Sequence, residues 1–409
     1  MTTAQNVHTV QQASPGVTAP TRPRLVTGPL VLRFVSVIGS SIGFYLPLSV
    51  VPLVAREAGS DSSAGMATVA LLGATVSCEL ATPRFVALVG YRWALALGLV
   101  FLGVPGLVLV FVASTPAILA VSVLRGMGFA VSVTAGGAVT AALIPAERRG
   151  EGLALVGIVS GVPGLLALPA GVWMAARWGY APVFVLTTVA TLLALVSVPG
   201  LPSRRTTGRR RAGSGAGNGA DDGGEGSVLA GLRRTAIRRP AAVFATSTAA
   251  VGVLVTYLPL AVTGAQAWVA AAALLVQPAA STAARWYAGR LGDRGGHAAL
   301  LRPGLALAIV GMLGVALTAS PVTVIGGSFV FGLGFGLLQN ATLCLMFAQA
   351  PDGSEGVVSA IWNAAYDLGM AAGALGAGLL VARTGFAALF VIAALVMVSG
   401  VAVAHRVAP

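Results

Sequence analysis

Two acidic residues lie inside apolar stretches of this sequence, where an ionised carboxylate is costly. Glu79 falls within the apolar run 65–86, and Asp367 falls within the run 357–382. Apolar surroundings penalise the charged form of a carboxyl group and bring its proton exchange closer to neutral pH. Both residues are therefore candidate proton-exchange groups.

Asp367 is the stronger of the two candidates. Its counterpart 206 residues earlier, in the internal repeat described below, is Gly161, so the packing of the repeat does not require an acid at this position. Each acid also has a structural alternative. Asp367 could stay ionised against an arginine or stay neutral as a hydrogen-bond donor, and Glu79 could form an ion pair with Arg33.

Three arginines also fall inside apolar runs. Arg33 lies near the start of its run and Arg285 near the end of its own, so their long side chains are expected to reach the membrane surface. Arg125 lies deeper and needs a partner or a water-filled cavity. Two roles are open for Arg125: contact with a substrate or proton pathway, and a structural link to backbone carbonyls of the first apolar run.

The rest of the chain is suited to a lipid bilayer. Hydrophobic residues make up 56% of its 409 residues and charged residues only 9%, whereas a soluble domain carries about 25% charged residues. An apolar helix of about 20 residues spans the hydrocarbon core of a membrane. We predict twelve such helices, over residues 29–54, 65–86, 92–113, 117–143, 152–176, 181–201, 241–262, 265–288, 298–319, 322–349, 357–382 and 385–405.

The second half of the chain repeats the first. A charged, glycine-rich loop follows the eighth predicted helix, and a degenerate copy of it lies 206 positions earlier. The same offset relates Arg84 to Arg290, Gly90 to Gly296, Gly126 to Gly332, Gly179 to Gly385 and Phe184 to Phe390. The sequence therefore predicts an all-α membrane protein of twelve transmembrane helices in two pseudo-symmetric six-helix bundles, residues 29–202 and 241–405.

The placement of the arginines predicts the orientation in the membrane. The chain has no lysine, and nineteen arginines fall in loops and tails on one side of the predicted helices, against three on the other. Because basic loops favour the cytoplasm, both termini are predicted to be cytoplasmic in a cell membrane. Residues 1–28 and 406–409 are the expected tails, the first of them disordered, and 203–240 is an expected flexible linker.

Glycine pairs spaced four residues apart occur in related helices of the two halves. They are Gly157 with Gly161, and Gly369 with Gly373. In membranes such small residues let helix backbones approach closely. The pairs predict either static helix packing or faces that slide when one half moves against the other.

Several motifs resemble those of the major facilitator superfamily over about residues 29–405. The charged loop matches the family pattern G-x-x-x-D-R-x-G. Further likenesses are the arginine-glycine motif of the fourth helix at 125–128, a degenerate antiporter motif at 157–171 and the proline motif of twelve-helix drug exporters at 38–52. Ala87 and Leu88 depart from the acid and arginine of the first-half loop, and the first helix lacks the acid that many proton-coupled exporters carry.

The resemblance implies a central cavity lined by helices 1, 4, 7 and 10, with helices 2 and 11 facing each other across the seam between the halves. Glu79 and Asp367 would then lie at this seam. The implied cavity residues are Tyr45, Arg125, Tyr257, Gln339 and Asn340. A mostly apolar cavity with a few hydrogen-bonding groups suits an amphipathic organic molecule.

The resemblance also implies that the charged loop is a gate on the cytoplasmic side, an ion-pair latch that opens and closes in each cycle. Its residues are Gly289, Arg290, Asp293, Arg294 and Gly296. The alternative is static anchoring, with the Asp293 carboxylate at the positive end of the ninth helix.

These features imply a monomeric, proton-driven exporter of small organic compounds, of the drug-efflux type. A proton-symporting metabolite importer of the same fold and a membrane sensor or scaffold that transports nothing are the alternatives. An enzyme is not expected, because no nucleophile and base stand at catalytic spacing. The three histidines and two cysteines are too scattered for a metal site, so we expect no metal, no cofactor and no nucleic acid.

Overall fold

The computed structural model describes residues 26–145, 149–201, 233–350 and 355–405. Predictions for the two tails and for most of the linker fall on residues outside this part. The part that is described is helical and contains no strand. Its α-helices are α1 (Gly28–Tyr45), α2 (Val50–Ala58), α3 (Asp61–Gly103), α4 (Val108–Phe111), α5 (Thr115–Leu143), α6 (Arg149–Trp178), α7 (Ala181–Leu195), α9 (Thr235–Ala261), α10 (Ala267–Gly295), α11 (Leu301–Ala316), α12 (Pro321–Ala348) and α13 (Glu355–Ala404). Short 3-10 turns are η1 (Val104–Leu107), η3 (Val198–Gly200), η4 (Gly264–Gln266) and η5 (His297–Leu300).

The long helix α3 contains a reversal of the chain at Gly90. This residue has a φ of 80°, in the left-handed region that only glycine adopts readily. Along a straight helix Leu71 and Gly98 would lie about 40 Å apart. Instead, Gly126 of α5 packs against the backbone of Leu71, while Gly98 packs against the backbone of Gly128, also on α5. The two parts of α3 therefore run antiparallel along the same stretch of α5.

The longest helix, α13, reverses in the same way at Gly385, where φ is 75°. Gly369 packs against Ala245 of α9, and Gly400 packs against Thr246 of the same turn. In a straight helix these two glycines would lie about 45 Å apart. Each of the two long helices thus holds two crossings of the bundle.

Among the described residues, ten helices are long and apolar enough to cross a membrane. One of these spans, Val357–Ala404, contains the two crossings of α13. The first part of α3, residues 61–89, adds another crossing, which is more polar because it packs against α13 rather than facing lipid. These twelve crossings confirm the predicted all-α membrane fold.

The predicted repeat is visible in the backbone. Gly90 and Gly296 have φ values of 80° and 83°, and Gly179 and Gly385 have values of 82° and 75°. Each pair is related by the offset of 206 residues, and each residue ends one crossing and begins the next. Because other residues are strained at these angles, the same turns require glycine in both halves.

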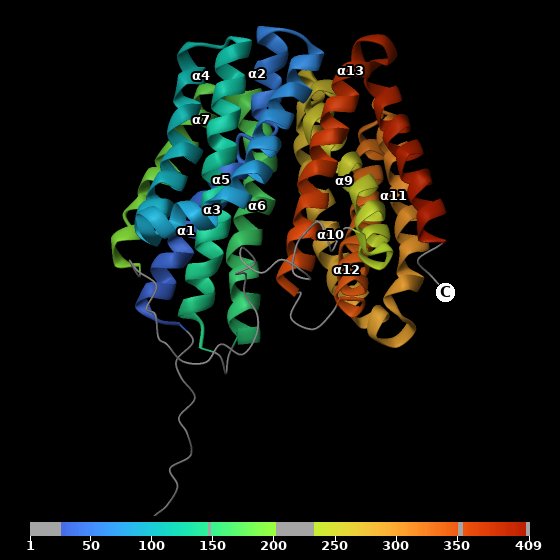
Figure 1. Ribbon diagram of the computed structural model, residues 1–409. Coiled ribbons are helices and arrows are strands. Elements are labelled where there is room, and N and C mark those ends of the chain that lie inside the picture. Colours follow the sequence, from blue (N-terminus) through green and yellow to red (C-terminus); the bar gives the residue numbers. More distant parts are fainter. Residues whose placement is uncertain (1–25, 146–148, 202–232, 351–354, 406–409) are drawn as a thin grey trace, which may run out of the picture.

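The two halves lie side by side (Figure 1), with α1 to α7 in the blue to green half and α9 to α13 in the yellow to red half. We call the end that carries the end of α2 and the turn of α13 the upper end. The lower end carries the start of α1 and the end of α12 (Figure 1). In the predicted orientation the upper end faces outward.

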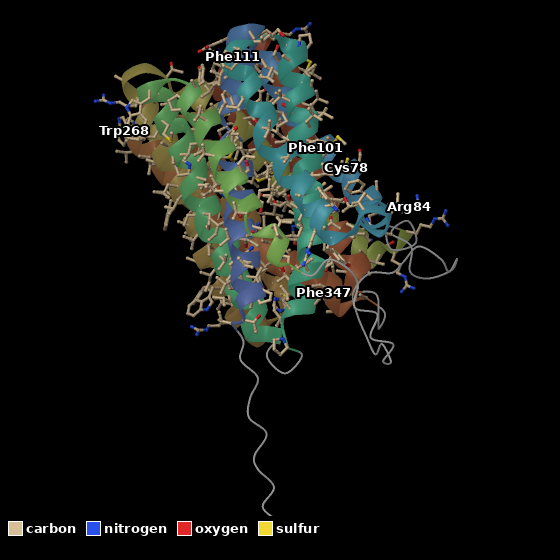
Figure 2. All side chains as sticks on the ribbon, turned by 90° about the vertical axis from the view of Figure 1, so that its left-hand side faces the viewer. Cys78, Arg84, Phe101, Phe111, Trp268 and Phe347 are labelled. Atoms are coloured by element: carbon tan, nitrogen blue, oxygen red, sulfur yellow. The ribbon has the colours of Figure 1, made fainter. Side chains whose placement is uncertain are left out.

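Large apolar side chains cover the outside of the bundle. Phe111 and Trp268, which Figure 2 labels, are 85% and 53% exposed, and Trp93 is 70% exposed. A surface of this kind is unfavourable in water and favourable in lipid. The exposure pattern agrees with a chain that spans a membrane.

The prediction of one continuous first helix over 29–54 is wrong, because the helix is interrupted near its middle. The chain leaves the helix after Tyr45 and resumes it at Val50. Pro47 is the physical reason, because it has no N–H to donate to the carbonyl of Gly43. Leu48 N donates instead to Tyr45 O at 3.2 Å, which closes a turn between α1 and α2.

The predicted linker is too long at its C-terminal end. Residues 235–240, assigned to the linker from their polar composition, form the first turns of α9. Ile237 is 2% exposed. Its hydrophobic cluster also contains Ala241, Met346, Val358 and Ile361, so burial of one apolar side chain extends the helix.

The two glycine pairs differ in their surroundings. Gly369 and Gly373 pack against the backbone of α9 at Ala245 and Ala249, which supports static helix packing in the second half. At Gly157 and Gly161 an added Cβ would meet nothing within 4 Å. The α6 face is therefore uncovered, although its partner face in the repeat is closely packed.

We expect Gly373→Val to destabilise the fold and Gly157→Val to leave it intact. The valine at 373 would collide with the Ala249 carbonyl, and overpacking costs about 1–3 kcal/mol or more. Its Tm should fall by about 1–4 °C. Thermal unfolding of the purified variants, followed by tryptophan fluorescence, measures this. Equal Tm values for both variants and the unsubstituted protein would contradict the close packing of α13 on α9.

Candidate functional site

Hydrogen bonds join the two halves near the upper end. Ser49 Oγ, after the break in helix 1, donates to Val255 O at 2.8 Å. Thr68 Oγ1 and Thr256 Oγ1 lie 3.1 Å apart and share a hydrogen bond. Both contacts connect the N-terminal half to α9, and all four residues are buried or nearly so. They form a polar seal between the halves.

Arg56 extends this seal to the upper surface. Its Nε lies 2.9 Å from Asp61 Oδ1, and its Nη1 donates to Leu260 O of the other half at 3.1 Å. The guanidinium also lies over the ring of Phe386, 5.4 Å from its centroid. We call these contacts and the polar seal together the upper clasp.

Tyr257 belongs to the upper clasp, which corrects its prediction as a cavity residue. Its ring is fully buried, and its hydroxyl donates to Ala374 O at 3.1 Å and reaches Asp61 O at 3.5 Å. Gly65 and Gly378 leave the space that the hydroxyl occupies. Tyr257 is therefore a contact between halves and does not face a substrate in this conformation.

A pocket of about 280 Å³ lies beside the clasp at the upper surface. Tyr180, between two membrane crossings, lines it and donates to Glu57 Oε1 at 2.5 Å. Burial, together with this hydrogen bond, raises the pKa of Tyr180 above its usual range. The phenol therefore stays protonated and remains a donor to Glu57.

A cavity of about 170 Å³ lies between the halves below the polar seal. Although the pocket beside the clasp is larger, we call this one the main cavity because it adjoins the acid pair described below. The N-terminal half lines it with Tyr45, Leu48, Gly161, Gly164, Leu165 and Leu168. The C-terminal half lines it with Val251, Val255, Gln277, Pro278, Ser281, Thr282, Arg285, Phe335, Gln339, Tyr366 and Met370. One wall is mainly apolar, and the other carries most of the polar groups.

Two of the five predicted cavity residues lie at this cavity. Tyr45 lines it from α1, and Gln339 lines it from α12 and accepts a hydrogen bond from Ser281 Oγ at 3.2 Å. Asn340 does not line it: its side chain is directed toward Gly289 of α10 and accepts from Cys344 Sγ at 3.8 Å. One residue further along a helix turns a side chain by about 100°, which takes Asn340 off the cavity face.

Arg125 is also outside the cavity, and the structural role is the one that its geometry supports. It is 1% exposed, and its Nη2 donates to Gly43 O at 3.3 Å and to Phe44 O at 3.2 Å. These are the carbonyls left without helical partners by the break at Pro47. Arg125 thus stabilises the broken first helix, although its Nε and Nη1 have no hydrogen-bond partner among the described residues.

Arg33 does not reach the membrane surface, so the prediction for it is wrong. It is 5% exposed, and its Nε donates to Gly136 O and to Thr140 Oγ1, each at 3.1 Å. Its Nη1 donates to Ser36 Oγ at 2.6 Å. Since Gly136 and Thr140 belong to α5, Arg33 links α1 to α5 and does not pair with Glu79.

Sequence reasoning missed the polar face of α10. Gln277, Ser281 and Arg285 are spaced four residues apart, so they lie on one face of the helix, and all three line the cavity. The span that contains them has a mean hydropathy of 1.4, the lowest of the ten candidate spans. This low hydropathy is the feature of the sequence that could have indicated a polar face on the helix. Arg285 is exposed, but into the cavity.

The two acids lie at the seam between the halves. Glu79 of α3 and Asp367 of α13 are both partly buried, and they lie close enough for their charges to interact. Tyr45 and Tyr366, which line the cavity, lie within electrostatic range of Asp367 as well. The acid pair therefore adjoins the cavity without lining it.

The charged loop lies largely inside a helix. α10 continues to Gly295, and the chain turns at Gly296 with a φ of 83°. Asp293 therefore lies in the last turn of α10, at its C-terminal end, and not at the start of the following helix. The expected position at a helix N-terminus is wrong. Arg290 lies over the Trp286 ring, 3.7 Å from its centroid. The side chains of Asp293 and Arg294 fall outside the described residues.

Several solved membrane transporters share this arrangement. The nucleoside transporter NupG has a TM-score of 0.71 at 12% identity, with 92% of this chain and 99% of that chain covered. The peptide transporter POT in complex with sulfate has a TM-score of 0.67 at 15% identity, covering 93% and 94%. The xylose transporter XylE from E. coli has a TM-score of 0.69 at 16% identity, covering 94% and 100%.

At these identities the likenesses establish the fold alone. No curated protein sequence matches the chain significantly. The family model of the Major Facilitator Superfamily matches residues 33–374, which is most of the chain. The expected resemblance is thereby confirmed at the level of the family: the chain belongs to the major facilitator superfamily of membrane transporters.

Proposed function

We propose that this protein is a proton-coupled transporter that exports small amphipathic organic compounds by alternating access. The observation that carries the proposal is a cavity at the seam, lined by both halves and adjoined by the acid pair Glu79 and Asp367. A substrate held between two halves can be passed from one side to the other when they rock. The acid pair supplies groups that can exchange protons during that motion.

The upper clasp and the uncovered α6 face support rocking between two states. Four side-chain hydrogen bonds that join the halves all belong to the upper clasp. At the lower side, Gly157 and Gly161 of α6 meet nothing within 4 Å. In the predicted orientation this conformation receives substrate from the cytoplasm. In the opposite state the clasp opens and the glycine face of α6 closes toward α10.

Proton uptake and release are coupled to the same cycle. With the upper side open, Asp367 takes a proton from outside as the substrate leaves. The neutral carboxyl then permits the halves to return, and the proton is released to the cytoplasm. A carboxyl group in a low-dielectric seam suits this exchange, because the neutral form moves through apolar surroundings at less cost than the charged form.

Transport direction is the test of this function. Susceptibility to a panel of toxic organic compounds is measured in cells with and without the protein, and a protected compound is then followed in proteoliposomes with an imposed pH gradient. Export predicts uptake into inside-out vesicles that are acidic inside. Accumulation in right-side-out vesicles would instead identify a proton-symporting importer, and no movement of any compound would leave a sensor or scaffold.

We expect Asp293→Asn to reduce transport about tenfold or more while leaving expression and compound binding close to wild type. The proposed latch needs the charge of Asp293. The loop does not line the cavity, so the rate of rocking should fall and the affinity should not. Arg302→Gln, at the start of α11 on the same side, is the matched control. Asp293→Asn transport at the wild-type rate would show that this loop is a static anchor.

A further inference from the structure

We propose that the main cavity selects organic anions, with Arg285 as the residue that recognises the negative group and the apolar wall of α6 holding the rest of the molecule. This inference rests on the proposed function and adds the charge of the substrate. It comes from three features of the cavity: an unpaired cation, donors along one helix face and an apolar opposite wall.

The Arg285 guanidinium is the only charged group that lines the cavity among the described residues. It is exposed, and within that part of the chain it has neither a hydrogen bond nor an ion pair. Asp367 adjoins the cavity but does not line it, and the one ion pair seen in the described residues joins Arg56 to Asp61. A cation in a cavity that is otherwise lined by neutral groups favours a ligand that neutralises it.

Neutral polar side chains continue from Arg285 along the same face of α10. Ser281 is one turn away and bridges to Gln339, and Gln277 is one turn further. The Tyr366 hydroxyl lies within electrostatic range of Arg285. A guanidinium can bind a carboxylate with two parallel hydrogen bonds, and neighbouring neutral donors can complete the shell of an anion.

The opposite wall is suited to an apolar body. Leu165 and Leu168 of α6 face the cavity, and Gly161 leaves room between them and α10. Leu48 extends this wall from the turn after α1. The two walls together fit a compact aromatic or aliphatic group that carries one carboxylate or sulfonate. A cationic compound of the same size would meet Arg285 unfavourably.

The electrostatic potential in the cavity is tested with an introduced thiol. Cys78 and Cys344 are first replaced by alanine, and Thr282→Cys places a thiol one turn from Arg285. Its reaction rates with sulfonatoethyl methanethiosulfonate and with trimethylammonioethyl methanethiosulfonate are each divided by the rate with free 2-mercaptoethanol. The anionic reagent should be favoured about tenfold, since opposite charges shift the two rates in opposite directions.

Substitutions assign this preference to Arg285. Arg285→Gln should remove most of it, Arg285→Lys should retain it, and Arg302→Gln, outside the cavity, should leave it unchanged. Equal normalised rates in the starting protein, or a preference that survives Arg285→Gln, would overturn the proposal. Size-exclusion profiles of all variants identify any that are misfolded, and the lysine variant keeps the comparison valid if glutamine is poorly tolerated.

Binding is tested with three probes that share one aromatic body: 1-naphthaleneacetate, 1-naphthaleneacetamide and 2-(1-naphthyl)ethylamine. Each is scored by how well it protects the introduced thiol from an uncharged maleimide. The acetate should protect at about tenfold lower concentration than the amide, and the amine should protect least. Failure of the acetate to protect at millimolar concentration, or equal protection by all three probes, contradicts anion selection.

These measurements need no proton gradient, so they separate the two proposals. Anion preference in a protein that moves nothing would overturn the proposed transport and leave the binding site. Proton-driven export of a cation or a neutral compound, with no anion preference at the cavity, would overturn this inference and leave the proposed function.

Discussion

Asp367→Asn is expected to abolish proton-driven uphill transport while exchange of substrate across the membrane continues. The carboxyl lies at the seam beside Glu79, next to Tyr45 and Tyr366 of the cavity. Asparagine keeps its size and its hydrogen bonding but cannot gain or lose a proton. A transporter with a permanently neutral group can still rock with substrate bound, but it no longer couples the motion to the pH gradient.

Uphill accumulation and downhill exchange are measured in the same proteoliposomes, with a compound identified by the susceptibility panel. We expect accumulation to fall about a hundredfold or more, and exchange to remain within about threefold of wild type. Glu79→Gln should show a weaker form of the same defect. Glu57→Gln, which changes a carboxyl at the upper rim, is the matched control. Wild-type accumulation by folded Asp367→Asn protein would exclude this residue as the proton carrier.

The second large effect is expected from a disulfide across the polar seal. Thr68 and Thr256 come from different halves, and their hydroxyl oxygens lie 3.1 Å apart. Cysteine sulfurs at these two positions would start near each other and need only a small movement to reach the S–S bond length of about 2.05 Å. In a protein lacking Cys78 and Cys344, Thr68→Cys with Thr256→Cys should cross-link under mild oxidation. Transport should then stop, because the upper end cannot open.

Mass spectrometry of the peptide pair measures the extent of cross-linking, and transport is measured before and after reduction. Activity should be lost in proportion to cross-linking and return with dithiothreitol. Each single cysteine variant, treated with the same oxidant, should keep its activity. Full transport by completely cross-linked protein would mean that the halves do not separate at this seal, and alternating access as proposed here would be wrong.

The residues at the chain reversals were predictable from the sequence, because the backbone conformation of a tight turn depends on the turn residue itself and not on distant contacts. Lipid forces each crossing to satisfy its backbone hydrogen bonds within a helix, so the number of apolar runs predicts the number of crossings. The turns at Gly90, Gly296, Gly179 and Gly385 need a positive φ whatever surrounds them. Matching glycines in the two halves therefore indicated both the repeat and the places where the chain turns.

The lining of the cavity was not predictable in the same way. A polar side chain in a membrane helix avoids lipid whether it lies in a cavity or against another helix, and hydropathy cannot separate the two cases. Arg125 and Tyr257 satisfy carbonyls at helix contacts, while Arg285 remains open to the cavity. The break at Pro47 creates the need that Arg125 meets, and helix rotation decides which polar groups face the cavity. Both depend on distant packing contacts, which only the folded structure brings together.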